Sequence, residues 1–250
     1  DDPRARFAHL FPARFQDSSL GRIPEGWEVK QLADQIGFQS GFAFKSKDWG
    51  DEGVPVVKIG SVKPGIIDLR EVSYVSENVA KDASRFRLEV ADLLIGMTGY
   101  VGTVGLVPPT KKFPLLNQRV GRFLIPKDKG STLPFWYCLM RQYEFRQFVE
   151  SQAHGTAQPN VSAKRILEYP ITMPPDEPMK QYNAICQSCF ERILNNHGEM
   201  ETLATIRDSL LPRLLSGELR LPEAERIAAQ AESEPEAAAE RMSVKPTDEA

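Results

Sequence analysis

The side chains with the most reactive chemistry in this sequence of 250 residues are its three thiols. Cys186 and Cys189 form a C-x-x-C pair, and Cys138 and His197 are the plausible further metal ligands. A structural zinc site is almost always four-coordinate, and no second C-x-x-C pair supplies the missing ligands. The pattern therefore predicts that the cysteines are small core residues and that the chain holds no metal.

Glycines recur at every third position over a short stretch: Gly96, Gly99, Gly102 and Gly105. They do not form the G-x-G-x-x-G pattern of a dinucleotide-binding turn, so they predict a strand–turn–strand in which glycine relieves crowding. The sequence also lacks a Walker-type phosphate loop, an H-E-x-x-H metal motif and a G-x-S-x-G nucleophile elbow.

Glu25, Glu28 and Lys30 resemble the carboxylate–lysine cluster of a nuclease. They flank a predicted turn, where charged side chains are usually solvated, so surface charges are the favoured interpretation. Pro174-Pro175 is followed by Asp176, so the Asn/Asp-Pro-Pro-aromatic tetrapeptide of adenine methyltransferases is missing too. No catalytic residue is predicted, and the chain is expected not to be an enzyme.

Residues 29–126 are predicted to form a sheet, because short β-branched runs alternate there with Gly, Pro and Asp. The predicted strands are Val54–Ile59, Gly65–Leu69, Asp92–Ile95, Thr103–Val107, Arg119–Ile125 and, later, Tyr169–Met173. One helix is predicted from Pro134 to Gln152, with Thr132 as its cap. Ser162 is the predicted N-cap of a short helical turn that contains Lys164 and Arg165.

The last third of the chain predicts a long helix from about Pro178 to Leu211, with one apolar seam. A narrow seam on a polar helix has to be covered by another helix, and the sequence shows no such helix in this chain. Pro212 is expected to break or kink the long helix. The predicted helix-pairing residues are Ile185, Cys189, Ile193, Met200, Leu203, Leu210 and Leu214, and Ile206 continues the same seam.

These elements predict an α+β protein, with a strand-rich mixed globular domain followed by a long coiled-coil-type helix. The expected division is an irregular linker or arm at 1–22, a globular domain at 23–175, the long helix at 176–218 and a disordered acidic tail at 219–250. The tail is Ala/Glu-rich and lacks a sustained apolar face, so disorder or weak helicity is expected there.

Charge is spread unevenly along the chain, although the formal net charge is only −3. Residues 221–250 hold eight acidic and three basic residues, whereas residues 41–170 hold 18 Lys and Arg against 13 Asp and Glu. The centre is therefore mildly basic, which permits nucleic-acid binding without proving it. There is no run of eighteen apolar residues and no signal-peptide pattern, so a soluble cytoplasmic protein without a membrane partner is expected.

A series of short motifs runs along most of the chain: Phe15–Val29, Ser40–Lys47 followed by Val54–Ile59, Leu94–Gly102, Leu116–Arg119, Gly155–Asn160 and the closing Leu210–Leu219. In their order and spacing these motifs resemble one half of the specificity subunit of a Type I restriction–modification enzyme. Together they span nearly all of residues 10–220. The entry segment resembles the link before a second target recognition domain, so a C-terminal half is the first choice. A natural half-length subunit that dimerises is the second.

The resemblance implies a non-catalytic subunit that recognises a DNA sequence. The long helix would pack against the helix of a second recognition half or of a homodimer partner, and the paired helices would dock modification subunits. Those modification subunits would bind S-adenosylmethionine and methylate adenine, and a motor-nuclease restriction subunit would use ATP and Mg²⁺. No cofactor is expected on this chain. A protein-binding oligomerisation adaptor remains the alternative from another functional class.

Specific recognition of double-stranded DNA uses Arg or Lys against guanine, Asn or Gln against adenine, and small polar or basic groups against phosphate. Five loops of the predicted domain carry that mixture. Phe42 and Phe44, which come just before the loop of Lys45 and Lys47, are predicted core residues. The candidate DNA-binding residues are Lys45, Lys47, Tyr100, Lys111, Lys112, Gln118, Arg119, His154, Gln158, Asn160 and Lys164.

Overall fold

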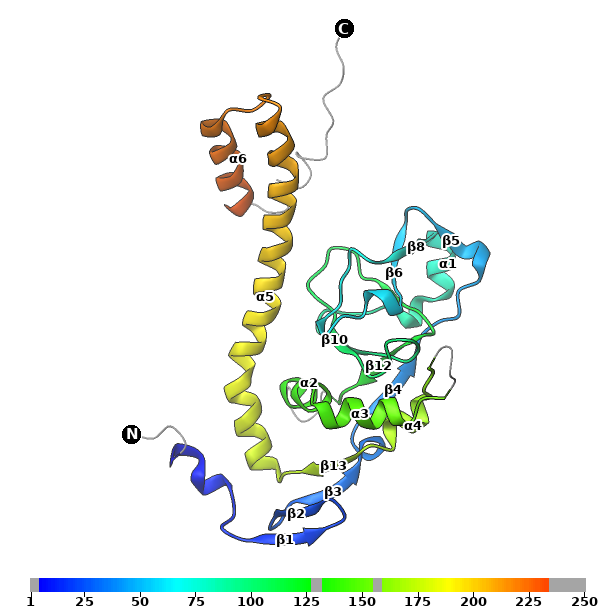
Figure 1. The fold of residues 1–250 in the computed structure, drawn as a ribbon, viewed down its shortest axis with the longest axis vertical. Coiled ribbons are helices and arrows are strands. Elements are labelled where there is room, and N and C mark those ends of the chain that lie inside the picture. The colour runs from blue at the N-terminus through cyan, green and yellow to red at the C-terminus, as the bar shows by residue number, and fades with distance from the viewer. Residues whose placement is uncertain (1–4, 127–131, 155–158, 234–250) are drawn as a thin grey trace. The chain divides into compact units, whose positions relative to one another are not determined.

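The computed structural model describes residues 5–126, 132–154 and 159–233 (Figure 1). The chain divides into two compact units, residues 1–191 and residues 192–250. The first unit contains every described strand, and helix α5, Asp176–Leu215, begins in it. The predicted α+β class, a strand-rich mixed domain followed by a long helix, is confirmed.

Thirteen strands are present in the described part of the first unit. They are β1 Phe15–Ser18, β2 Gly21–Pro24, β3 Glu28–Gln31, β4 Gly37–Ser40, β5 Trp49–Gly50, β6 Val54–Val57, β7 Gly65–Ile66, β8 Ser73–Val75, β9 Leu93–Gly96, β10 Val104–Leu106, β11 Leu115–Leu116, β12 Val120–Leu124 and β13 Pro170–Met173. The described helices are α1 Glu77–Asp82, α2 Leu133–Met140, α3 Tyr143–Ser151, α4 Ala163–Leu167, α5 and α6 Leu221–Ser233. Each of the six predicted runs contains a strand.

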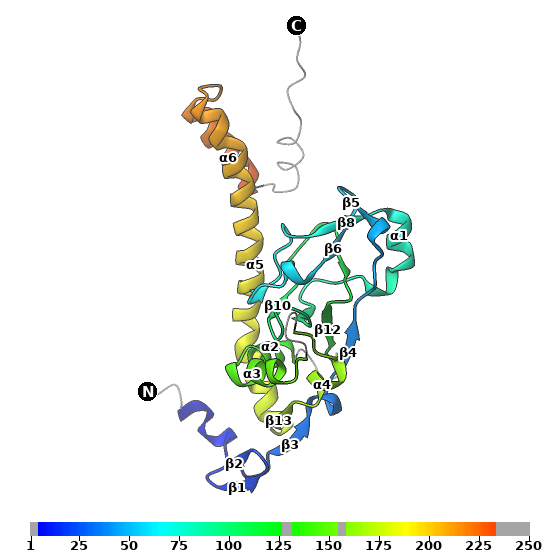
Figure 2. The same cartoon turned by 45° about the vertical axis from the view of Figure 1, so that its right-hand side comes forward.

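Two mixed sheets form the body of this unit. The five-stranded sheet has the order β4-β12-β9-β10-β7, and the four-stranded sheet has the order β11-β6-β8-β5. β10 pairs with β7, and β11 with β6, in parallel, and the other neighbours are antiparallel. Figure 2 shows the labelled strands of the four-stranded sheet beside α1, with α3 and α4 toward the other end of the unit.

One hydrophobic cluster joins the two sheets. Val56 of β6, Leu94 of β9 and Leu115 of β11 belong to this cluster and are completely buried. β6 and β9 are buried at every position, as expected for apolar strands covered on both faces. The prediction that Phe42 and Phe44 are core residues is confirmed, because Phe44 is buried and Phe42 packs against it.

The helix predicted from Pro134 to Gln152 is in fact two helices, α2 and α3. α2 buries Trp136 and Met140, four residues apart, and α3 buries Phe145 and Val149, also four residues apart. The step from Met140 to Phe145 is five residues, which on one continuous helix would turn the second pair away from the first. The break at Arg141–Gln142 lets both pairs face the core. Thr132 precedes α2, but its side chain makes no capping hydrogen bond.

The N-terminal arm is more regular than the sequence predicted. β1 and β2 form an antiparallel hairpin whose turn contains Gly21, with φ of +92°. This left-handed conformation suits glycine and explains why a tight turn is possible here. The prediction of an irregular arm is therefore wrong over β1 and β2. A second small sheet pairs β3 with β13, which joins residues 28–31 to residues 170–173.

The first turns of α5 belong to the globular unit. Phe190 packs edge-on against Tyr137 of α2, with ring centroids 4.9 Å apart. Asn183 is buried; its Oδ1 accepts the backbone N–H of Phe135, and its Nδ2 donates to the carbonyl of Met179. Part of α5 is therefore a domain helix, with a face that differs from the predicted seam.

The second unit is built on the last turns of α5 and on α6. Ile206, Leu210 and Leu219 form its buried cluster, and Leu214 and Ile227 of α6 pack against that cluster. The prediction that this part of the seam needs a helix from another chain is therefore wrong for Leu210 and Leu214. Of the two states expected for the tail, disorder or weak helicity, residues 221–233 adopt the helical one as α6, and Ile227 of α6 packs against the cluster that contains Leu219. Residues 234–250 lie outside the described residues.

Helix α5 continues through Pro212 to Leu215, so Pro212 does not end it. Proline lacks an N–H donor, and its ring crowds the carbonyl four residues earlier. The following turn still closes, because the Ser216 N–H donates to the carbonyl of Pro212 at 3.0 Å. The helix ends at Leu215, and Gly217 just beyond it has a φ of +75°, the left-handed conformation that glycine favours after a helix.

Candidate nucleic-acid interface

Three segments far apart in sequence meet beside the β9–β10 hairpin of the five-stranded sheet. They are the hairpin loop 97–103, the segment 117–119 before β12, and the segment 159–161. The Met97 N–H donates to the carbonyl of Arg119, and the Val161 N–H donates to the carbonyl of Met97, both at 3.0 Å. The Gly99 N–H donates to the carbonyl of Pro159 at 3.0 Å. We call these three segments the loop cluster.

The loop cluster unites several of the residues that the sequence singled out. Tyr100, Gln118, Arg119 and Asn160 lie in it and are exposed. Buried Asn117 shapes the middle segment, because its Oδ1 accepts the backbone N–H of Arg119 at 3.2 Å. Side chains that can pair with base edges are therefore presented on backbone that is held in place.

His154 is linked to the cluster through its main chain. Its N–H donates to the carbonyl of Asn160 and its carbonyl accepts the N–H of Asn160, both at 2.9 Å. His154 does not cap the preceding helix α3, because Gln152 occupies its C-cap position. Gln158 lies outside the described residues, so its prediction is unchanged.

Helix α4 follows the cluster directly and carries its basic groups. Ser162 is the N-cap, as predicted, and its side chain accepts the N–H of Arg165. Arg165 is paired with Glu168 at 2.9 Å, whereas exposed Lys164 has no ion pair among the described residues. α4 contacts β4, which keeps this turn on the five-stranded sheet (Figure 1).

The remaining basic candidates lie elsewhere in the domain. Lys45 and Lys47 flank and occupy the 3-10 helix Ser46–Asp48, where the Lys45 N–H donates to Asp48. That helix leads into β5, at the end of the unit opposite to α4 (Figure 1). Lys111 and Lys112 are exposed in the β10–β11 connection. Within the described residues, no hydrogen bond or ion pair joins any of these lysines to the loop cluster.

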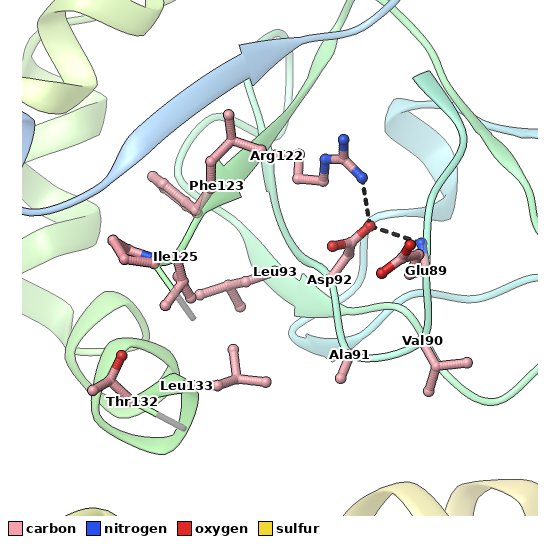
Figure 3. Close-up of a pocket in the computed structure, with 12 residues that line it drawn as sticks. Glu89, Val90, Ala91, Asp92, Leu93, Arg122, Phe123, Ile125, Thr132 and Leu133 are labelled. Carbon is pink, nitrogen blue, oxygen red and sulfur yellow. Dashed lines mark hydrogen bonds and ion pairs between the residues drawn. The ribbon is translucent and has the colours of Figure 1, made fainter. Parts of the chain in front are cut away.

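A cavity of about 600 Å³, which no sequence pattern indicates, lies between β9, β12 and the start of α2 (Figure 3). Arg122 pairs with Asp92 at 2.8 Å and donates to the carbonyl of Arg87 and to Gln39. Asp92 and Gln39 are 30 and 83 residues from Arg122, a separation that no local pattern reveals. This network ties β12 to β4 and to the segment before β9, so its evident role is to hold the sheet.

The thiols and carboxylates of the described residues do not gather into a metal-binding group. Cys138 and Cys189 are exposed, so the prediction of core cysteines is wrong for both, and burial raises the pKa of Cys186. The described residues contain no group of three or more His, Cys, Asp or Glu that could hold a metal ion. Lys30 pairs with Glu28 at 2.8 Å and lowers the pKa of that exposed carboxyl, in keeping with the predicted surface charges.

Helix-pairing residues outside the α6 contact are exposed. In the first unit, Ile185 is 48% exposed and Cys189 is also exposed. In the second unit, the exposed fractions are 39% for Ile193, 65% for Met200 and 52% for Leu203. Large apolar side chains are thus exposed to solvent along much of α5. None of the described helices is both long and apolar enough to span a membrane.

Known proteins with similar sequences are specificity subunits of Type I restriction enzymes. The chain is 28% identical, over 211 residues, to the Type I restriction enzyme MjaVIII specificity subunit of Methanocaldococcus jannaschii, covering 83% of this chain and 49% of that protein. It is 30% identical, over 200 residues, to the HindI specificity subunit of Haemophilus influenzae, covering 79% of this chain and 42% of that protein. The chain thus spans about half the length of these relatives.

The fold has a solved counterpart. A crystal structure of a Type I restriction–modification S subunit from M. genitalium superposes with a TM-score of 0.50 at 15% identity, over 86% of this chain and 48% of that one. The family described as Type I restriction modification DNA specificity domain matches residues 24–204, which include the whole loop cluster and most of α5. The chain belongs to this family of DNA specificity domains.

Proposed function

We propose that this chain is a DNA-sequence-recognition half of a Type I specificity subunit, and that its loop cluster reads one half-site. The observation that carries the proposal is the convergence of exposed Tyr100, Arg119 and Asn160 from three separate segments. A structural role would not require exposed polar side chains at the meeting point of three hydrogen-bonded loops. A site that reads bases requires such side chains.

Two side chains of the loop cluster and one on α4 suit particular contacts with DNA. Arg119 can donate two hydrogen bonds to the O6 and N7 atoms of guanine, and Gln118 can pair with N6 and N7 of adenine. Lys164 on α4 supplies a positive charge for a phosphate, which fixes the register without reading sequence. The excess of Lys and Arg in residues 41–170 favours such an approach to DNA.

The proposal is tested by selection from a pool of duplexes with a randomised core. The full chain is incubated with the pool at moderate salt, and the bound duplexes are sequenced. We expect one short half-site to be enriched and Arg119→Ala to bind it about 5- to 100-fold more weakly. Arg119→Lys keeps the charge but not the bidentate geometry of the guanidinium. Compared with Arg119→Ala, it should therefore restore affinity for random duplex more than it restores base preference.

Equal binding of enriched and random duplex by the wild-type chain would refute sequence recognition. A protein-binding adaptor would then be the better interpretation, because an adaptor needs no base preference. Unchanged preference in the Arg119→Ala variant, with specific binding by the wild type, would instead remove Arg119 from the interface.

The exposed apolar side chains of α5 support a second proposal, about partners. A helix from a second recognition half, or from another copy of this chain, would cover Ile185 and Cys189 in the first unit and Met200 and Leu203 in the second. Exposed apolar side chains at a helical period favour such pairing. Leu210 and Leu214 are left out of this proposal because the chain covers them itself.

The chemistry would come from other polypeptides. Modification subunits docked on the paired helices would bind S-adenosylmethionine and methylate adenine, and a restriction subunit would use ATP and Mg²⁺. The sequence supports this division because it lacks the nucleotide-binding and methyltransferase motifs. The chain itself would be non-catalytic and would work in the cytoplasm, where the DNA is.

A further inference from the structure

Tyr100 stands alone at the tip of the β9–β10 loop. Its side chain is 67% exposed, whereas nearby Thr98 and Val101 are buried, with exposed fractions of only 9% and 4%. Tyr100 has no ring partner and no cation over its ring among the described residues, so its apolar ring faces solvent. An aromatic ring exposed at the tip of a buried loop is available to bind a partner.

The backbone around Tyr100 is closed into a tight turn. Gly99 has a φ of +71° and Gly102 a φ of +79°, conformations that other residues rarely adopt. The Gly102 N–H donates to the carbonyl of Gly96 at 3.1 Å, and the Thr103 N–H donates to the carbonyl of Tyr100 at 3.3 Å. The loop therefore leaves Tyr100 few conformations for its main chain.

The loop is also held from outside. The Thr98 hydroxyl donates to the side-chain Oδ1 of Asn160 at 2.9 Å, across 62 residues of sequence. α3 backs the other side, because a Cβ on Gly102 would lie only 3.3 Å from the Cγ of Arg146. A residue fixed in this way loses little conformational entropy when it binds, so its contact area converts into affinity.

We infer that the tip of the β9–β10 hairpin enters the major groove of DNA, that Tyr100 contacts a base there, and that Thr98 is the positioning residue that orients Asn160. This inference rests on the proposed function and assigns it a groove and two residues. The major groove is wide enough for a two-stranded β-ribbon. β9 and β10 lie inside the five-stranded sheet, so the loop that joins them is the part that would enter the groove. The Tyr100 ring suits a thymine methyl, and its hydroxyl suits a polar base edge.

The Thr98 contact decides what Asn160 offers. Its Oδ1 accepts from the Thr98 hydroxyl, and its Nδ2 makes no hydrogen bond among the described residues. Asn160 is therefore presented as a donor, which matches acceptors of the major groove such as purine N7, guanine O6 or thymine O4. Without the Thr98 hydroxyl the amide could turn over, and this preference would be lost.

The test uses the full chain and the half-site enriched from the randomised pool. Affinity is measured for every single-base-pair change of the half-site with the wild type, Tyr100→Ala, Tyr100→Phe, Thr98→Val and Thr98→Ser. We expect Tyr100→Ala to lose about 5- to 100-fold for the enriched half-site and to lose its preference at one or two adjacent base pairs. Its affinity for random duplex and its thermal unfolding should stay close to wild type.

The Thr98 pair separates positioning from folding. Thr98→Val removes the hydroxyl at nearly constant volume, so preference at the base pair read by Asn160 should flatten. Thr98→Ser keeps the hydroxyl and should restore that preference. Equal base preferences in Thr98→Val and Thr98→Ser would overturn the positioning role, even if both variants were less stable.

Modified bases test the groove. We expect 7-deazapurines, or deoxyuridine in place of thymidine, to weaken the wild type at the position assigned to Tyr100 and to leave Tyr100→Ala unaffected. Equal weakening of both proteins, or none in the wild type, would overturn the major-groove contact. If the wild type enriches no sequence, the proposed function fails; if it does and Tyr100→Ala enriches the same sequence equally well, only this inference fails.

Discussion

At the scale of single residues, neighbouring positive charges on α4 are in different states. Lys164 is exposed without an ion pair among the described residues, whereas Arg165 is paired with Glu168 at 2.9 Å. A paired charge already has its counter-ion, so only Lys164 is ready to displace cations from DNA.

We predict that Lys164→Ala makes the negative slope of log K against log salt concentration shallower by about 0.9, the effect of losing one phosphate contact. Base preference should stay unchanged, because phosphate contacts carry no sequence information. Arg165→Ala is the matched control and should change the slope by less than half as much. The measurement is fluorescence anisotropy with labelled duplex between about 50 and 200 mM salt. Equal slopes for the wild type and Lys164→Ala would exclude the contact.

Asp68 gives a residue-scale prediction about pH. The Arg70 guanidinium, hydrogen-bonded to Asp68 at 2.9 Å, is the main cause that lowers the pKa of this carboxyl from 3.8 to about 2. A lowered pKa means that the ionised form stabilises the fold above about pH 4 and that this stabilisation is lost as pH falls toward 2.

Asp68→Asn removes that titration and keeps the shape of the side chain. We expect the free energy of unfolding to differ most between wild type and Asp68→Asn above about pH 4, and the difference to shrink as pH falls toward 2. Urea unfolding at a series of pH values measures this difference. A difference that stays constant over the range would show that the Asp68–Arg70 pair does not stabilise the fold.

At the scale of elements, α6 changes what the end of α5 can do. Leu219 is 4% exposed and joins the cluster of Ile206 and Leu210, whereas nearby Leu221 is 68% exposed. The chain therefore supplies its own cover for the last turns of α5.

We predict that Leu219→Ala destabilises this small cluster by about 2 kcal/mol, the lower end of the cost of truncating a buried leucine. Amide hydrogens of residues 206–215 should exchange faster, which hydrogen-exchange mass spectrometry detects. The control Leu221→Ala should change stability by less than about 0.5 kcal/mol. Equal exchange in the two variants would mean that Leu219 does not cover the end of α5 in solution.

The middle of α5 gives the opposite prediction. Met200 and Leu203 are exposed, so replacing both by Gln should not disturb the fold but should weaken association through the helix by about tenfold or more. Thr205→Gln, exposed on another side of the same helix, is the control and should associate like the wild type. Sedimentation velocity at rising concentration measures the mass. Identical mass curves for the wild type and the double variant would contradict pairing through these residues.

At the scale of the whole molecule, recognition and reaction are expected on different polypeptides. We predict that the chain incubated alone with DNA and labelled S-adenosylmethionine yields no methylated adenine. Adding the modification subunits should give product at the enriched half-site. Product from the chain alone, at a level that follows its concentration, would show that it is an enzyme.

The sequence by itself determined the broad answer. Val54–Ile59 and Asp92–Ile95 are short apolar runs bounded by turn residues, so local physics is enough to predict strands there. The order of the motifs from Phe15 to Leu219 indicated the family, and Ser162 was identified as an N-cap from its type and place alone.

Only the tertiary structure decided which candidates work together. Thr98 and Asn160 are 62 residues apart, and Gln39 and Arg122 are 83 apart, so no local pattern links them. The break between α2 and α3 and the cover that α6 gives to Leu210 likewise depend on what each side chain touches in the fold. Local propensity fixes the type of a segment, but a site made of loops exists only once long-range contacts have closed it.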